Sequence, residues 1–274
     1  MVLAGLINAL KYLGKSKEKV KIAMIGAGAS NVCGARLLVA YGVPIGNIIM
    51  VDSKGILHKN RTDIEMEKET WIAKWELCLN SNSEQRTGGI AEALEGADVC
   101  IGMSTPGPGT IKKEWVQRMA KDSIVFACAN PIPEIWPWEA KEAGARIVAT
   151  GRSDFPNQVN NSLGFPGIFR GTLDVNAKTI TDEMCIAAAT ELAKVAEDRG
   201  IREDYLIPTM DDWEVFPREA VAVGMKAIEQ GVARIKLSEK ELYKRAEAII
   251  KLARSITKSL MKQGYIPKPP KGLV

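Results

Sequence analysis

Residues 20–34 read Val-Lys-Ile-Ala-Met-Ile-Gly-Ala-Gly-Ala-Ser-Asn-Val-Cys-Gly, and this stretch decides the fold. An apolar run at 20–25 ends on a glycine-rich turn, and an Ala/Leu-rich segment with helical periodicity continues to Tyr41. The order predicts a strand, a tight turn and a helix. In a Rossmann turn the first glycine permits the turn and the second lets the backbone approach a pyrophosphate. Gly26 and Gly28 match these two positions.

Two further residues bear on the ligand of this turn. The position of the third glycine is Asn31, a departure that should loosen helix–strand packing slightly, with Gly34 one turn further on. Asp52 ends the next apolar run, close to the spacing at which an acid binds the adenine ribose. Its charge would repel a 2′-phosphate, which favours NAD, although nearby basic residues leave NADP open. The pyrophosphate would lie near Ala29 and Ser30, at the positive end of the helix dipole.

The pattern beyond the turn predicts an α/β fold of the Rossmann type, with a doubly wound parallel sheet and added C-terminal helices. Apolar strands are expected at 47–51, 98–102, 123–127 and 145–149, and helices at 63–79, 90–94, 112–120 and 137–143. Residues 151–171 lack periodicity and predict a long loop, followed by helices at 181–197, 217–230 and 238–262. We expect a single domain over 1–274: a packing helix at 1–17, the Rossmann core at 18–150 and the remainder at 151–274.

Composition narrows the class of partner. The 37 basic and 33 acidic residues are interleaved, with no polybasic surface for a nucleic acid or a membrane. The apolar start is too short for a membrane span. Five scattered cysteines without metal-ligand spacing predict buried thiols in a reducing cytoplasm. Small molecules are therefore the expected ligands.

Three segments follow expected strands, where parallel sheets bind ligands. Gly102–Gly109 contains Ser104 and Thr105 and can bring main chain close to a cofactor; a ligand-free Pro/Gly turn is the alternative. Asn130 ends the next strand and can donate to a ribose or substrate oxygen. The loop at 151–171 is rich in asparagines, among them Asn160 and Asn161, which are as often simple turn residues.

Several segments together resemble malic enzymes, in their C-terminal, cofactor-binding domain. They are KIAMIGAGASNVCGARLL, VDSKG, ACANPIPEI, ATGRSDFPNQVNNSLGFPGIFRGTLD and TITDEMCIAAATELA, and the similarity runs from residue 2 to about 260. Malic enzymes oxidise malate with NAD(P) and decarboxylate the product to pyruvate and carbon dioxide with a divalent metal.

The resemblance implies roles for individual residues. The residues implied to bind the cofactor are Gly26, Gly28, Ala29, Ser30 and Asp52. From their positions at the turn and after the strands, Asn31, Ser104, Thr105 and Asn130 are expected to contact the cofactor as well. Asn130 and Asn160, with Asn161 beside them, are implied to reach the nicotinamide ribose and the malate carboxylates.

The resemblance also implies a missing half. The catalytic tyrosine and lysine of the family, and its ligands for Mg²⁺ or Mn²⁺, belong to an N-terminal half and to a DDxxGTA-like segment expected just before Val2. We expect that half in cis or as a separate chain, and expect this chain alone to bind NAD without turning over malate.

Two other functions stay open at this point. One is a different Rossmann dehydrogenase, which shares the turn but should lack the 151–171 segment. The other is a non-catalytic NAD-sensing module. Because the apolar first helix would normally pack on the missing half, an exposed patch and a homo-oligomer are also expected.

Overall fold

The computed structural model describes residues 1–267, which divide into two compact units. Unit 1 comprises Met1–Gly164 and Ala189–Met210, and unit 2 comprises Phe165–Ala188 with the chain from Asp211 onward. The boundary after Gly164 differs from the subdivision at residue 150 expected from sequence. That the two units make one domain stays a prediction.

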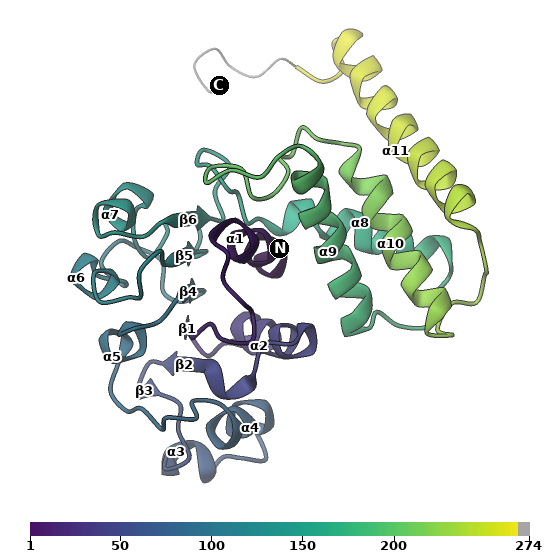
Figure 1. Ribbon diagram of the computed structural model, residues 1–274. Coiled ribbons are helices and arrows are strands. Elements are labelled where there is room, and N and C mark those ends of the chain that lie inside the picture. Colours follow the sequence, from purple (N-terminus) through teal and green to yellow (C-terminus); the bar gives the residue numbers. More distant parts are fainter. Residues whose placement is uncertain (268–274) are drawn as a thin grey trace. The chain divides into compact units, whose positions relative to one another are not determined.

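A six-stranded sheet in the order β3-β2-β1-β4-β5-β6 forms the centre of unit 1 (Figure 1). Its strands are β1 (Ile22–Ile25), β2 (Ile48–Asp52), β3 (Gly55–Ile56), β4 (Val99–Gly102), β5 (Ile124–Ala127) and β6 (Ile147–Thr150). Neighbouring strands are parallel except β3, which pairs antiparallel with β2. The predicted parallel sheet is confirmed, and β3 is an addition too short for a sequence pattern to reveal.

Helices cover both faces of this sheet (Figure 1). One face carries α1 (Val2–Leu13) and α2 (Ala29–Tyr41), and the other carries α5 (Ile90–Leu94), α6 (Lys113–Val116) and α7 (Pro137–Glu142). The predicted helix at 63–79 is divided into α3 (Thr62–Glu65) and α4 (Ile72–Asn80). Short 3₁₀ turns occupy Ile45–Asn47 and Asn161–Leu163. The doubly wound arrangement is thus the observed one.

The first helix packs within unit 1, contrary to our expectation of an exposed patch. Leu3, Leu6 and Leu10 are buried, and a Cβ atom on Gly5 would lie 3.3 Å from the Phe126 ring of β5. The buried Asn8 donates hydrogen bonds to the carbonyls of Ala193 and Leu206. This helix therefore gives no support for a homo-oligomer, because its apolar residues are already covered.

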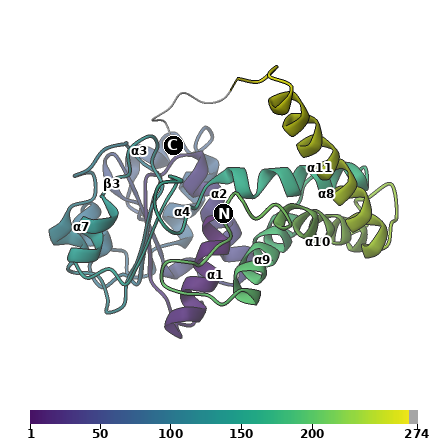
Figure 2. The same ribbon diagram turned by 90° about the horizontal axis from the view of Figure 1, so that it is seen from above.

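Unit 2 is built from helices (Figure 2). It contains α8 (Phe165–Asp174), α10 (Val215–Glu229) and α11 (Glu239–Lys262), while α9 (Asp182–Asp198) begins in unit 2 and ends in unit 1. The expected loop at 151–171 was wrong over its last third, where α8 begins. Gly167 and Gly171 suggested a loop, but they allow α8 to approach α10: a Cβ on Gly171 would lie 2.4 Å from the Ala220 carbonyl oxygen.

Candidate functional site

The glycine turn opens the helix α2 and leaves its first amides accessible. Gly26 has φ 99°, and a Cβ there would lie 2.6 Å from the Met103 carbonyl oxygen, so only glycine fits. Gly28 is the N-cap of α2, no side chain caps this helix, and a Cβ on Gly28 would meet nothing within 4 Å. Ala29 and Ser30 are exposed. Free amides at a helix N-terminus, with open space before them, suit a pyrophosphate.

Asn31 forms hydrogen bonds across the joint between β1 and α2, where we expected slightly looser packing. Its side chain is 1% exposed, and its Nδ2 donates to the carbonyl oxygens of Ile25 at 2.9 Å and Gly26 at 2.8 Å. The close helix–strand contact expected of a third glycine lies instead at Gly34, whose Cβ would stand 3.4 Å from the Met24 methyl group. The Asn31 side chain thus holds the glycine turn in place through these hydrogen bonds. A contact between Asn31 and the cofactor stays a prediction.

Asp52 ends β2 with its carboxylate already surrounded by donors. Arg61 donates to both of its oxygens, at 3.1 and 2.9 Å, Lys74 lies 2.5 Å from Oδ2, and the Lys54 amide donates to Oδ1. The side chain of Asp52 is 8% exposed. A ribose hydroxyl could reach this carboxylate only by displacing one of these donors, so the ribose contact of Asp52 stays a prediction.

The charges around Asp52 change its expected effect on the cofactor. Burial raises the pKa of the Asp52 carboxyl, but hydrogen bonds from Arg61 and Lys74 outweigh burial and hold that pKa below its ordinary value. Arg61 also binds Asp63, which in turn pairs with Lys54. Three cations therefore face two carboxylates, so the negative charge expected to repel a 2′-phosphate is offset.

Glu134 is a buried carboxylate that the sequence reasoning missed. Its Oε1 accepts hydrogen bonds from the amide and hydroxyl groups of Ser104, and its Oε2 accepts from the Ala129 amide. It therefore joins the loops that follow β4 and β5. An acid inside the apolar, proline-rich segment PIPEIW was the only available signal, since its partner Ser104 lies 30 residues away.

Two of the predicted substrate residues come together at the end of β6. A Cβ on Gly151 would lie 3.1 Å from Asn130 Nδ2, and Asn160 Nδ2 donates to the Gly151 carbonyl oxygen at 2.9 Å. Asn160 also accepts hydrogen bonds from the amide and hydroxyl groups of Ser162, which fixes its rotamer. Asn130 is exposed, so its amide remains available to a ligand.

The other two candidates, Thr105 and Asn161, are exposed and less constrained. Thr105 accepts a hydrogen bond from the Thr110 hydroxyl through its main-chain carbonyl, which leaves its side chain toward solvent. Asn161 begins the 3₁₀ turn that Asn160 caps. Because β1, β4, β5 and β6 are parallel, the glycine turn, Ser104, Asn130 and Asn160 follow the carboxyl ends of strands on one edge of the sheet.

Comparison with known proteins decides the family. Residues 1–232 match the family model "Malic enzyme, NAD binding domain". The chain belongs to the malic enzyme family. It is 44% identical to the NAD-dependent malic enzyme of Geobacillus stearothermophilus over 85% of this chain and 47% of that protein. With the NADP-dependent malic enzyme of Halomonas elongata it shares 42% identity over 84% of this chain and 56% of that protein.

A solved malic enzyme structure has the same fold. The crystal structure of the Entamoeba histolytica malic enzyme superposes with a TM-score of 0.95 at 51% sequence identity, covering 98% of this chain and 55% of that one. The chain thus spans about half the length of the malic enzymes that it matches. It corresponds to their NAD-binding domain, so the turn at Gly26 belongs to a family that uses NAD or NADP.

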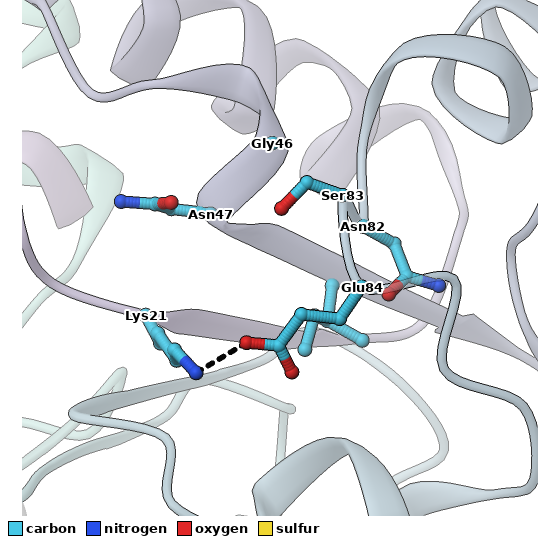
Figure 3. Close-up of a pocket in the computed structure, with 7 residues that line it drawn as sticks. Lys21, Gly46, Asn47, Asn82, Ser83 and Glu84 are labelled. Atoms are coloured by element: carbon cyan, nitrogen blue, oxygen red, sulfur yellow. Dashed lines mark hydrogen bonds and ion pairs between the residues drawn. The ribbon is translucent and has the colours of Figure 1, made fainter.

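Other features of this malic enzyme domain lie away from the cofactor edge. A pocket lined by Lys21, Gly46, Asn47, Asn82, Ser83 and Glu84 lies at the amino ends of β1 and β2, where Lys21 pairs with Glu84 (Figure 3). Among residues 1–267, no three His, Cys, Asp or Glu side chains cluster as metal ligands would, and no helix is long and apolar enough to cross a membrane.

The cysteines are free thiols in the part of the chain that the structure describes. Cys78 and Cys100 are buried, as predicted, whereas Cys128 and Cys185 are half-buried and Cys33 is exposed on α2. Burial, together with the nearby Glu134 carboxylate, raises the pKa of the Cys128 thiol to about 12. Cys128 is therefore protonated and unreactive at neutral pH.

Proposed function

We propose that the protein oxidises malate with NAD(P) and decarboxylates the product, giving pyruvate and carbon dioxide, and that this chain supplies the dinucleotide site. The observation that carries the proposal is the meeting of Asn130 and Asn160 at Gly151, on the same sheet edge as the glycine turn. Two neutral amides beside a nicotinamide can bind a carboxylate and a hydroxyl oxygen of malate without shifting the charge of the site.

The residues divide into two groups along this edge. Gly26, Gly28, Ala29 and Ser30 would hold the pyrophosphate, with Asn31 fixing the turn beneath them. Ser104, Thr105 and Asn130 would flank the nicotinamide half, and Asn130, Asn160 and Asn161 would bind malate. When bound, the nicotinamide accepts the hydride from malate. These side chains would orient the substrate for that step, and a base of the N-terminal half would take the proton of the malate hydroxyl group.

For the cofactor we propose NAD, with NADP accepted as well. Asp52 supports NAD because it stands at the strand end where a ribose-binding acid is expected. The cations Lys54, Arg61 and Lys74 around it support tolerance of a 2′-phosphate. The names of the Geobacillus and Halomonas relatives cover both cofactors.

The remaining groups are proposed to come from an N-terminal malic-enzyme half, in cis or as a separate chain. The chain's share of its relatives' length supports this division. That half would supply the ligands for Mg²⁺ or Mn²⁺, which as a Lewis acid would stabilise the enolate formed by decarboxylation. The free thiols of residues 1–267 support a cytoplasmic location for the assembled protein.

Reconstitution tests this function. The purified chain with malate, NAD and Mn²⁺ should produce no NADH, and adding the N-terminal half of a malic enzyme should start turnover. Asn130→Ala should then lower kcat/KM for malate by about tenfold or more, roughly 1.4 kcal/mol, with a smaller effect on NAD affinity. Asn80→Ala, an exposed asparagine on α4, is the matched control and should change neither quantity. Turnover by the chain alone, or full activity of Asn130→Ala, would contradict the proposal.

A further inference from the structure

Asn157 lies in the loop after β6, in a backbone conformation that few residues adopt. Its φ is 56°, in the left-handed region, which glycine, asparagine and aspartate tolerate best. The residue is only 7% exposed, so it differs from an ordinary turn asparagine that faces solvent. The fold therefore holds an asparagine side chain inside the protein at a position where glycine would satisfy the backbone.

The Asn157 side chain uses its donors and its acceptor on three main-chain groups. Its Nδ2 donates to the carbonyl oxygens of Val148 at 3.2 Å and Glu203 at 2.8 Å, and its Oδ1 accepts from the Leu206 amide at 2.9 Å. Glycine at this position would make none of these hydrogen bonds, and aspartate would keep only the acceptor. Of these three residue types, asparagine alone joins all three groups.

The segment 203–206, to which Asn157 binds, is itself held by the first helix. The carbonyl oxygen of Leu206 accepts a hydrogen bond from Asn8 Nδ2 at 2.7 Å. Asn8 is fully buried in α1 and also donates to the Ala193 carbonyl oxygen. All of these residues belong to unit 1. Asn157 therefore connects the loop after β6 to a segment that the rest of unit 1 keeps in place.

The residues directly after Asn157 lead to the proposed substrate residue Asn160. Gln158 pairs with Thr150 in a parallel bridge, and the Val159 amide donates to the Thr150 carbonyl oxygen at 2.7 Å. The chain thus runs in extended form beside the end of β6. An extended chain advances about 3.3 Å per residue and alternates its side chains between two faces. A slip of one residue at Asn157 would therefore move Asn160 and turn its side chain to the other face.

We propose that Asn157 is a positioning residue for malate, which holds Asn160 in place without contacting the substrate. The inference rests on the proposed function, because it takes Asn160 as a malate-binding residue. Misplacing a substrate-binding group by about 1 Å can lower the rate about a hundredfold, so a buried anchor three residues away is close enough to affect turnover. None of the three hydrogen bonds of Asn157 involves the glycine turn after β1, so NAD affinity should not depend on this anchor.

Asn82 offers a matched control within the same unit. It has φ 50° and is 1% exposed, its Nδ2 donates to the carbonyl oxygens of Leu57 and Arg86, and its Oδ1 accepts from the Arg86 amide. Its side-chain hydrogen bonds thus equal those of Asn157 in number and kind. Asn82, however, lines the pocket at the amino ends of β1 and β2 (Figure 3). Glycine at either position removes three hydrogen bonds without straining the backbone.

The two variants are compared in the enzyme reconstituted with the N-terminal half. Asn157→Gly and Asn82→Gly should both lower the urea midpoint, because each leaves main-chain groups without a partner. Asn157→Gly should also lower kcat/KM for malate by about tenfold, whereas Asn82→Gly should keep it within about twofold of the parent. The Kd for NAD should stay within about twofold of the parent in both variants. A purely structural role of Asn157 would lower the midpoint without the specific loss for malate.

Hydrogen–deuterium exchange of the chain alone tests the anchor independently of turnover. In Asn157→Gly the amides of residues 158–164 should exchange at least about tenfold faster than in the parent, while those of residues 26–31 should not change. Unchanged exchange at 158–164 would overturn the proposal, and so would a kcat/KM for malate that is unaltered in Asn157→Gly or equally lowered in Asn82→Gly. A reconstituted parent enzyme without turnover would instead contradict the proposed function, and the exchange would still decide whether Asn157 fixes the loop that contains Asn160.

Discussion

Asp52 and Glu134 are carboxylates that organise the cofactor edge in different ways. Asp52 is held by cations, whereas Glu134 is held by two main-chain amides and a hydroxyl group. Each charge is therefore compensated locally, as a carboxylate removed from water requires. Neither side chain needs to contact the substrate to affect activity, because each holds in place loops that are proposed to contact it.

Replacing Glu134 should loosen the loops after β4 and β5. In Glu134→Gln one carboxylate oxygen becomes an NH₂ group, which cannot accept from either amide, so a buried donor loses its partner. We expect the free energy of unfolding to fall by about 2 kcal/mol and NAD affinity to fall with it. Glu142→Gln, an exposed residue paired with Lys113, is the control and should cost under about 0.5 kcal/mol. Equal urea midpoints for both variants would show that Glu134 does not hold these loops.

Replacing Asp52 should shift the cofactor preference toward NADP. In Asp52→Asn the side-chain oxygen can still accept hydrogen bonds from the surrounding donors. Arg61 and Lys74, however, lose the negative charge that they share. The resulting positive field should weaken NAD binding and strengthen NADP binding, changing the ratio of their Kd values by about tenfold. Calorimetric titrations of both cofactors measure the ratio. Asp204→Ala, an exposed acid, should leave the ratio unchanged, and an unaltered ratio in Asp52→Asn would remove Asp52 from cofactor selection.

Among the elements, the strands were the most predictable from sequence. Apolar runs ending on Asp52, Gly102 and Asn130 predicted β2, β4 and β5 within one or two residues, because buried parallel strands need continuous apolar sequence. The helix α8 was missed because its glycines look like loop residues until α10 is placed against them. That contact cannot be predicted from the local sequence.

The candidate site was predictable in part. Gly26 and Gly28 were predicted from the need for glycine in a phosphate-binding turn, and Asn130 was predicted from its position after a strand. The hydrogen bonds of Asn31, the cations around Asp52 and the bridge made by Glu134 join residues that become neighbours only when the chain folds. The role of a side chain that positions other residues is therefore hard to predict from a single sequence.

The contact between α8 and α10 should make stability depend on pH. Glu219 of α10 is fully buried, neither carboxylate oxygen has a hydrogen-bond partner, and burial raises the pKa of this carboxyl to about 9. Below pH 4.5 the folded and unfolded chains both carry the proton, so this group contributes no pH dependence. Between about 4.5 and 9 only the folded chain keeps it, so the free energy of unfolding falls as pH rises, with an upper limit of about 1.4 kcal/mol per unit.

Glu219→Gln should remove this dependence. The amide is neutral at every pH, so its free energy of unfolding should not fall as that of the parent does. The difference in free energy of unfolding between the variant and the parent should therefore grow from pH 5 to pH 8, by at most about 4 kcal/mol. Thermal unfolding at both pH values measures the gain. Glu229→Gln, at the exposed end of the same helix, is the control and should keep the parent's slope. A Glu219→Gln variant whose slope equals that of the parent would show that the carboxyl ionises in the folded chain.

At the scale of the whole molecule, the proposed site residues all lie in one of the two units. Unit 1 contains every proposed cofactor and substrate residue, from Gly26 to Asn161. Unit 2 contains α8, α10 and α11 and none of these residues.

The most direct test of the central claim is calorimetric titration of NAD into the chain and into Gly28→Val. Gly28 has φ −83° and open space before its Cβ, so valine fits the folded chain but occupies the place proposed for the pyrophosphate. Gly89→Val is the matched control, since Gly89 is also a helix N-cap with negative φ and a Cβ would have no atom closer than 3.7 Å. We predict that the parent and Gly89→Val bind NAD alike and that Gly28→Val binds at least about tenfold more weakly, roughly 1.4 kcal/mol. A parent chain that does not bind NAD, or a Gly28→Val variant that binds as tightly as the parent, would contradict the account.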